Sequence, residues 1–575
     1  MKRILIFLIS CFFVFSVRAA EIVNVEYIHN AIRQNWDITV PYNTELLNPQ
    51  IAANMKYLLT SVDVANEILN GGKITSYGTD ETYATENAAD TIATDEAIKT
   101  LVTKVSYPFE MMTTADTTEF GFAIAASGTF YVDWGDGNVE KIKKADTTKI
   151  KYSHTYAVAG EYNIKLGGTA TGYSSTAYTE VVSFRENNNL AKIFGSLGQV
   201  FPTIENNVLP RFMYSFYRCK NLTGEIPAEL FSGVVGVPRV HMFINMFYGC
   251  SKLVGEIPDG LFSGIKGPPA EGVFSQTFTG CSGLTGKIPS GLFSGIKGKP
   301  ASSMFASTFS GCSGLTGEIP GELFSGISGA PASGMFNLTF SGCTGLSGTI
   351  PKNLFSGIKG KPASYMFSGT FSGCSGLTGG LSPELFAGIS GAPATSMYSS
   401  LFFQCKNLTG SIPNSFFGSF NGAPANNMFQ NTFTGCTGLT GEIPENLFIG
   451  ISGNPAAYMF QNTFSECHNL TGKVSAGLFS GISGAPANNM FSGTFNSSGI
   501  TAISENIFAG ISGTATTGMF QKTFYNCTKL TGSSAKTNGR YLYEIWPDAT
   551  ESQVGQMYSL DAGLSDYAEI PAAWK

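Results

Sequence analysis

The most regularly spaced reactive residues in this chain are cysteines, whose thiols could form disulfides or bind a metal ion. Nine of them lie 31 residues apart, Ser498 takes the next place in the series, and Cys527 follows. A fixed period of this length is typical of repeat proteins, in which each unit buries its apolar face against its neighbours. The nine are Cys219, Cys250, Cys281, Cys312, Cys343, Cys374, Cys405, Cys436 and Cys467.

The expected surroundings of these thiols disfavour both reactions. Equivalent residues of stacked repeats lie about 4.7–4.9 Å apart with parallel side chains, whereas a disulfide needs Cβ atoms about 3.8 Å apart. With the cysteine counted as position 0, phenylalanine recurs at −3 and leucine at +3, and both are expected in the core. The chain has no CxxC pair, and its four histidines, at 29, 154, 241 and 468, do not cluster. We predict buried, free thiols and no metal site, with disulfides between neighbouring repeats as the alternative.

A second set of reactive residues recurs at position +6, where the side chain should point to solvent. Glu225 and Glu256 fall on adjacent repeats, so their carboxyls could approach the ~5–5.5 Å separation that retaining glycosidases use. The sequence shows no phosphate-binding loop, GxSxG motif or histidine relay. We therefore interpret the column as a solvated, non-catalytic binding face without cofactor, and keep a polysaccharide-active enzyme as a distant alternative. The candidate ligand-binding residues are Glu225, Glu256, Lys287, Glu318, Glu442 and Lys473.

The pattern within one repeat predicts the elements that position these columns. Residues Leu284 to Ile288 alternate between inward and outward positions, which indicates a short strand. Leucine, phenylalanine and isoleucine at +11, +12 and +15 show helical spacing, as do the phenylalanines at +24 and +28 with the next cysteine. We predict an α/β repeat solenoid over 184–535, with one short parallel strand and two short helical segments in each of about ten repeats.

The stretch 105–183 has the alternation and turn signals of a small all-β sandwich. Strands are expected at 120–124, 129–132, 139–142 and 162–166. Its Val132–Gly137 turn (VDWGDG) and the later Ser153–Tyr156 and Gly160–Tyr162 segments resemble the PKD-like fold, which implies an extracellular spacer or carbohydrate-associated module. Asp133 and Asp136 could ligate calcium, or could belong to an Asp-Gly turn between strands.

The two ends of the chain carry further signals. Lys2 and Arg3 precede the apolar run 4–17, which predicts a signal peptide over 1–19. Residues 20–104 read as a helical segment, opened by Pro49, and a polar linker. No later stretch has the ~20 consecutive apolar residues that span a bilayer. After Gly532 the repeat pattern ends, so 536–575 is predicted to cap the array, with a strand over 541–546.

The segment 308–320, TFSGCSGLTGEIP, resembles the BspA-like leucine-rich repeats of bacterial surface proteins, in a 31-residue variant. That family has diverse partners, so the resemblance implies adhesion or recognition without naming a ligand. The formal net charge of −6 argues against nucleic acid as a partner. We expect an exported protein at the cell surface, outside the cell or in the periplasm. It would bind an extracellular protein or glycan through the repeat face, or, as the alternative, act as a structural spacer or display protein of the envelope without a specific ligand.

Overall fold

The computed structural model describes residues 106–176, 178–560 and 563–575. The predicted signal peptide and the predicted segment 20–104 lie outside these residues. The chain divides into two compact units. Of the described residues, the first holds 106–110, 127–145 and 162–171, and the second holds 111–126, 146–161 and the rest from 172 to 575.

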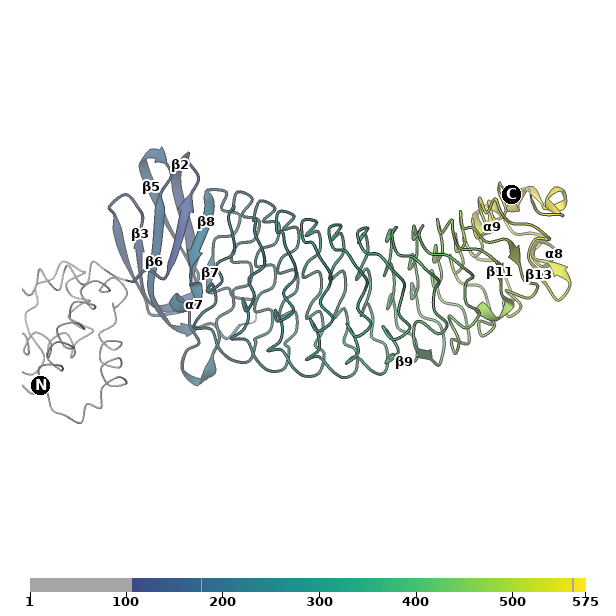
Figure 1. Ribbon diagram of the computed structural model, residues 1–575, viewed down its shortest axis with the longest axis horizontal. Coiled ribbons are helices and arrows are strands. Elements are labelled where there is room, and N and C mark those ends of the chain that lie inside the picture. Colours follow the sequence, from purple (N-terminus) through teal and green to yellow (C-terminus); the bar gives the residue numbers. More distant parts are fainter. Residues whose placement is uncertain (1–105, 177, 561–562) are drawn as a thin grey trace, which may run out of the picture. The chain divides into compact units, whose positions relative to one another are not determined.

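The elements are labelled as in Figure 1. The N-terminal strands are β1 (Phe109–Thr113), β2 (Thr117–Ile124), β3 (Ala126–Asp133), β4 (Val139–Lys144), β5 (Ile150–Gly160), β6 (Asn163–Tyr173), β7 (Val182–Ser183) and β8 (Leu190–Gly195). Helix α7 (Leu197–Val200) and the 3-10 helix η1 (Glu205–Asn207) follow, and then β9 (Ser390–Gly391), β10 (Ser419–Phe420), β11 (Lys473–Val474), η2 (Ala476–Phe479) and β12 (Ala502–Ile503). The last elements are β13 (Lys536–Thr537), β14 (Arg540–Tyr541), α8 (Leu542–Ile545), α9 (Glu551–Val554), η3 (Tyr567–Glu569) and η4 (Ala572–Trp574).

The N-terminal strands form an antiparallel β-sheet domain. One sheet has the order β4-β3-β6-β1-β8 and the other the order β5-β2-β7. Strand β3 pairs antiparallel with β4, and β2 pairs antiparallel with β5 and β7. The four strands expected from the sequence are confirmed as parts of β2, β3, β4 and β6. Strand β5 was not among these four. It contains the Ser153–Tyr156 segment of the PKD-like resemblance, and Ile150, Tyr152, Tyr156 and Val158 share one face of it.

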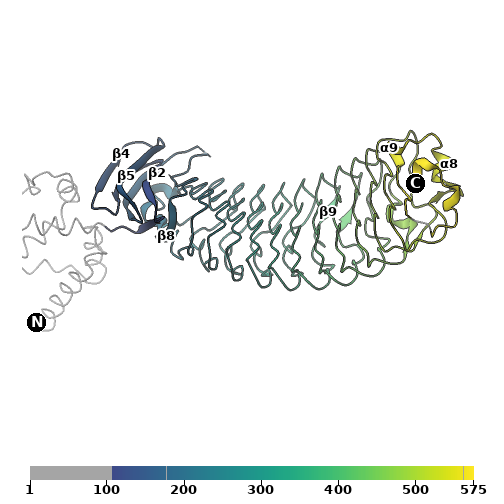
Figure 2. The ribbon, with the colours of Figure 1, turned by 90° about the horizontal axis from the view of Figure 1, so that it is seen from above.

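From about residue 212 the chain is a periodic repeat region whose successive turns lie side by side (Figures 1 and 2). In the segment from +22 to +30, alternate N–H groups donate to the next repeat. Phe305 N bonds to Met335 O at 3.0 Å, and Phe309 N bonds to Thr339 O at 2.9 Å. The N–H groups between them bond three residues back, as Thr308 N does to Phe305 O at 3.2 Å. Each repeat is therefore joined to the next by a ladder of backbone hydrogen bonds.

This segment is a chain of tight turns, so the predicted second helical segment is wrong. Every fourth residue has a left-handed backbone, with φ of 52° at Ser303, 54° at Ser307 and 73° at Gly311. A four-residue period places Phe305 and Phe309 on one face, just as an α-helix would. The two conformations share this spacing, and apolar periodicity alone cannot distinguish them.

The predicted strand and first helical segment also take a different form. Leu292 N bonds to Pro289 O and Ile296 N to Phe293 O, each three residues back, so in this repeat the segment is again made of turns. In the repeat of Cys467 the same place is the short 3-10 helix η2. The residue at +5 is left-handed, with φ of 73° at Gly286, and this interrupts the strand expected there. Neighbouring repeats still align in parallel, because isolated bridges join Gly317 to Leu346 and equivalent pairs. The parallel direction is confirmed, and the region has few helices.

Three columns of phenylalanine fill the core of the repeat region. At +24, Phe305 and Phe336 stack with ring centroids 5.8 Å apart. At +28, Phe309 and Phe340 stack at 5.7 Å, and at +12 Phe293 packs against Phe305 at 4.7 Å. Such pairs contribute about 0.5–1.5 kcal/mol each beyond burial of their area. These columns hold the turns in register and so fix which residues face outward.

The C-terminal part continues the hydrogen bonding without the repeat sequence. Phe520 N bonds to Gln553 O and Phe524 N to Met557 O, so residues 552–559 take the place of a further repeat. The strand predicted over 541–546 is wrong beyond Tyr541, since Leu542–Ile545 form α8. Its capping box, in which Tyr541 N donates to Oε2 of Glu544 at 2.8 Å, explains the helix start. No helix in the described part of the chain is long and apolar enough to cross a membrane.

Candidate ligand-binding face

The six charged residues at position +6 all lie on the surface of the repeat region. Each is exposed, and each is followed by a buried apolar residue at +7, such as Ile288 after Lys287. Lys473 belongs to β11, where it pairs in parallel with Ala502. The outward orientation expected from the alternation is therefore found at Glu225, Glu256, Lys287, Glu318, Glu442 and Lys473.

Glycine at +5 of the next repeat lets these side chains lie along the surface, except at Lys473, whose partner in the next repeat is Ala502. A Cβ added to Gly286 would come 2.5 Å from Cγ of Glu256, the +6 residue of the preceding repeat. The same relation holds between Gly317 and Lys287, at 2.9 Å, and between Gly348 and Glu318, at 2.5 Å. The aliphatic stem at +6 thus rests in the space that the next repeat's glycine leaves open, and the charged end is carried above the following repeat.

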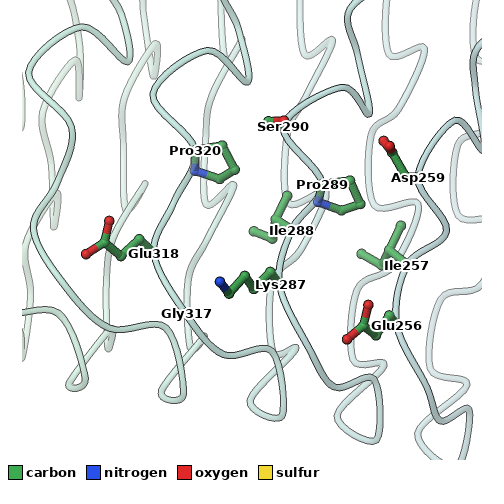
Figure 3. A pocket seen from close by; sticks show the side chains of 10 residues that line it. All are labelled: Glu256, Ile257, Asp259, Lys287, Ile288, Pro289, Ser290, Gly317, Glu318 and Pro320. Carbon is green, nitrogen blue, oxygen red and sulfur yellow. The ribbon is translucent and has the colours of Figure 1, made fainter.

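Three of the six residues line one open depression of about 600 Å³. Glu256, Lys287 and Glu318 lie next to one another on three adjacent turns (Figure 3). The remaining side chains of this wall come from positions +7, +8 and +9 and are Ile257, Asp259, Ile288, Pro289, Ser290 and Pro320. Glu225, Glu442 and Lys473 are not part of it. The structure therefore groups three of the candidate residues and leaves the other three apart.

The depression combines apolar walls with unpaired charge. Glu256, Asp259 and Glu318 carry carboxylates around the single ammonium group of Lys287. Among the described residues, Lys287 forms no ion pair, so its amino group is available to a ligand. Asp259 and Ser290 at +9 were missed by the sequence reasoning. The sequence feature that could have indicated them is the variability of position +9. Successive repeats carry Asp259, Ser290, Gly321 and Lys352 there.

The cysteines face the core, and their thiols are in an environment that makes them unreactive. All ten in the described residues are free and buried. Cys312 Sγ donates to the carbonyl oxygen of Phe278 at 3.0 Å, and Cys281 does the same to Phe247 at 3.1 Å. Burial raises the pKa of Cys343 to about 12 and that of Cys281 well above its ordinary value. Since the thiolate is the reactive form, these side chains are poor nucleophiles and poor metal ligands.

The aspartates of the β domain form turns. Asp133 Oδ1 accepts from Gly135 N at 3.0 Å, and Asp136 Oδ1 accepts from Asn138 N at 3.1 Å. Both bonds join residues two apart, which is the geometry of an Asp turn between β3 and β4. No cluster of three or more potential metal ligands occurs among the described residues.

No family model matches this chain, and no curated protein matches it significantly.

Proposed function

We propose that this chain is an exported, surface-associated repeat protein that binds an extracellular protein or glycan without chemically changing it. In this proposal the repeat region is a solenoid related to BspA-like leucine-rich repeats, and the β domain is a PKD-like spacer. The observation that carries it is the contrast between columns. Inward positions keep phenylalanine, cysteine and leucine through the array, whereas the outward +6 and +9 positions change from repeat to repeat. Core packing explains why the inward residues are constant, but it does not explain which residues occupy the outward positions.

The depression around Lys287 is the best-supported contact site on this face. It offers three carboxylates, one ammonium group and the rings of Pro289 and Pro320, on turns that are hydrogen-bonded to one another. A shallow site of this kind suits a broad contact of modest affinity, because few ligand atoms can be fully enclosed. The stems of Glu256, Lys287 and Glu318 rest against the glycine of the next repeat, which restricts their rotamers and lowers the entropy lost on binding.

The test is a face-directed set of substitutions. The triple variant Glu225→Gln, Glu256→Gln and Glu318→Gln changes the charge and keeps the shape of the face. Binding to host cells, matrix proteins and a glycan array should fall at least tenfold if the +6 column makes the contact. The matched control replaces Glu229, Glu271 and Glu322, which are exposed and lie outside the +6 and +9 columns. Equal binding by the triple variant and the wild type, with equal melting temperatures, would move the site elsewhere.

A structural spacer remains the second candidate. It is favoured by the unbroken ladder of hydrogen bonds and stacked rings, which would make the array stiff whether or not it binds anything. A screen of proteins and glycans that finds no reproducible binder would support it. A polysaccharide-active enzyme would require turnover that disappears in Glu225→Gln.

A further inference from the structure

Two arginines and three tyrosines form a surface cluster at the start of the repeat region. We call it the Arg–Tyr cluster, and it consists of Arg185, Tyr214, Tyr217, Arg218 and Tyr248. Tyr217 lies at its centre and stacks on Tyr248 with ring centroids 5.1 Å apart. The guanidinium of Arg185 lies 4.7 Å from the Tyr217 centroid and 5.2 Å from that of Tyr214. Arg218 covers Tyr217 at 5.2 Å and Tyr248 at 5.9 Å.

The packing of the repeats does not require these residues. Tyr217 and Tyr248 occupy position +29, which is threonine or serine in the next four repeats (Thr279, Ser310, Ser341 and Ser372). Arg218 occupies +30, which is glycine in the next five. Arg218 and Tyr214 both have left-handed backbones, with φ of 53° and 56°. A large side chain in that conformation costs roughly 1–2 kcal/mol more than glycine.

The two guanidinium groups carry uncompensated charge. Both arginines are exposed, and neither makes an ion pair or a side-chain hydrogen bond with another described residue. Stacking on an aromatic ring uses the flat face of a guanidinium and leaves its N–H donors at the edge. Those donors match the paired oxygens of a carboxylate or sulfate. The rings hold the arginines in place before binding, which lowers the entropy lost with an anionic ligand.

We propose that the Arg–Tyr cluster binds the carboxylate or sulfate groups of an acidic polysaccharide. The site is separate from the +6 face and does not depend on it. Beyond Tyr248 the +29 column continues with the half-buried residues Thr279 and Ser310. The hydroxyl of Thr279 donates to Ser307 O at 2.6 Å and can still accept a hydrogen bond from a ligand hydroxyl group. A peptide is a less suitable ligand, because the backbone N–H groups along this edge already donate to the next repeat and cannot pair with an added strand. Gly249 N bonds to Thr279 O, and Gly280 N bonds to Ser310 O, which leaves no edge for strand addition.

The experiment measures binding of the full chain to polygalacturonate and dextran sulfate, with neutral dextran and polyglutamate as comparison probes. The variant Arg185→Gln with Arg218→Gln should bind the two acidic polysaccharides roughly tenfold more weakly or worse, since charge-assisted hydrogen bonds are lost. Added salt should weaken wild-type binding, because exposed charges are screened. Neutral dextran should not bind.

Two further variants separate this site from general charge and from folding. Lys299→Gln with Lys361→Gln removes the same charge from exposed positions far from the cluster and should leave binding unchanged. Arg185→Lys with Arg218→Lys keeps the charge without the flat, forked group and should recover only part of the loss. An equal loss in the Lys299 and Lys361 control, or full binding by the glutamine variant with an unchanged melting temperature, would overturn the proposal. Tighter binding of polyglutamate than of both polysaccharides would overturn the choice of ligand.

Discussion

The thiol of Cys312 donates a 3.0 Å hydrogen bond to the carbonyl oxygen of Phe278, which lies three residues before Cys281, the preceding cysteine of the series. The bond recurs at every cysteine of the series, including Cys219 to Phe184 and Cys467 to Phe433. Threonine at +27 forms a parallel ladder, as Thr308 Oγ1 does to Phe274 O at 3.0 Å. These two columns satisfy carbonyls inside the phenylalanine core, where an unpaired carbonyl would be costly. The cysteine is thus a small apolar residue with one donor.

The first prediction concerns thiol reactivity. We expect the folded protein to react slowly with a thiol reagent at neutral pH, since all ten described cysteines are buried and protonated. After denaturation without reductant, the same ten should titrate as free thiols. Ser498 supports this, because it takes a cysteine's place and its Oγ lies 3.7 Å from Sγ of Cys527. A count near zero in the denatured, unreduced protein would show that neighbouring repeats are disulfide-linked.

The second prediction is a loss of stability at high pH. Burial raises the pKa of Cys343 and Cys405 from 9.0 to about 12. Above pH 9 the unfolded chain loses these protons while the folded chain keeps them, so the stability is complete below pH 9 and falls as the pH rises towards 12. At pH 10 the loss should be about 1.4 kcal/mol per thiol. Urea unfolding at pH 8 and pH 10 measures it.

Lysines and tyrosines also titrate in this range, so a control is needed. The variant Cys343→Ser should be less stable than the wild type at pH 8, and the difference should narrow at pH 10. A difference that stays constant between the two pH values would mean that this thiol does not contribute to the pH dependence.

The third prediction compares two aromatic positions of the core. Phe309→Ala removes a fully buried ring that stacks on Phe278 and Phe340, and it should cost about 3–5 kcal/mol. Tyr398 occupies a phenylalanine column, and its buried hydroxyl has only a 3.4 Å contact with Phe417 O. Tyr398→Phe should therefore change the free energy of unfolding by less than about 1 kcal/mol. Chemical unfolding followed by circular dichroism tests both, and a large loss in Tyr398→Phe would show that the hydroxyl is needed.

The sequence predicted the core columns and their direction because burial leaves a strong signal. Phe309, Cys312 and Leu315 recur in register, and all three are fully buried. The prediction of a helical segment around Phe305 and Phe309 was wrong. An apolar spacing of four residues fits both a helix and a chain of turns in which every fourth residue is left-handed. A finer signal was available at +22, +26 and +30, where glycine and asparagine are frequent, for example Asn427, Asn431 and Gly435. These residue types tolerate positive φ.

For the candidate site, the sequence identified the +6 column and could not identify its grouping. Glu256, Lys287 and Glu318 share a depression because prolines and +9 side chains close its wall, which depends on the path of the turns. The Arg–Tyr cluster was also missed. Arg185 lies before the first cysteine of the series, so no column places it against Tyr217, and only the folded chain brings the two together.

The last prediction tests whether the +6 side chains rest against the glycine at +5 of the next repeat. It compares alanine substitutions at two equivalent glycines. Gly286 and Gly410 both occupy +5, with φ of 73° and 76°, so alanine at either should cost roughly 1–2 kcal/mol for the left-handed backbone. They differ in their neighbours. An added Cβ at Gly286 would lie 2.5 Å from Cγ of Glu256, whereas at Gly410 its nearest neighbour is Cα of Gly380 at 3.8 Å.

Gly286→Ala should therefore cost about 0.5–1.5 kcal/mol more than Gly410→Ala, because Glu256 must leave its rotamer. Adding Glu256→Ala removes Cγ, so the double variant should lose this extra cost and match Gly410→Ala once the effect of Glu256→Ala alone is subtracted. Urea unfolding of the four variants completes the cycle. If Gly286→Ala and Gly410→Ala cost the same, the stem of Glu256 does not rest on Gly286, and the glycines at +5 serve the backbone alone.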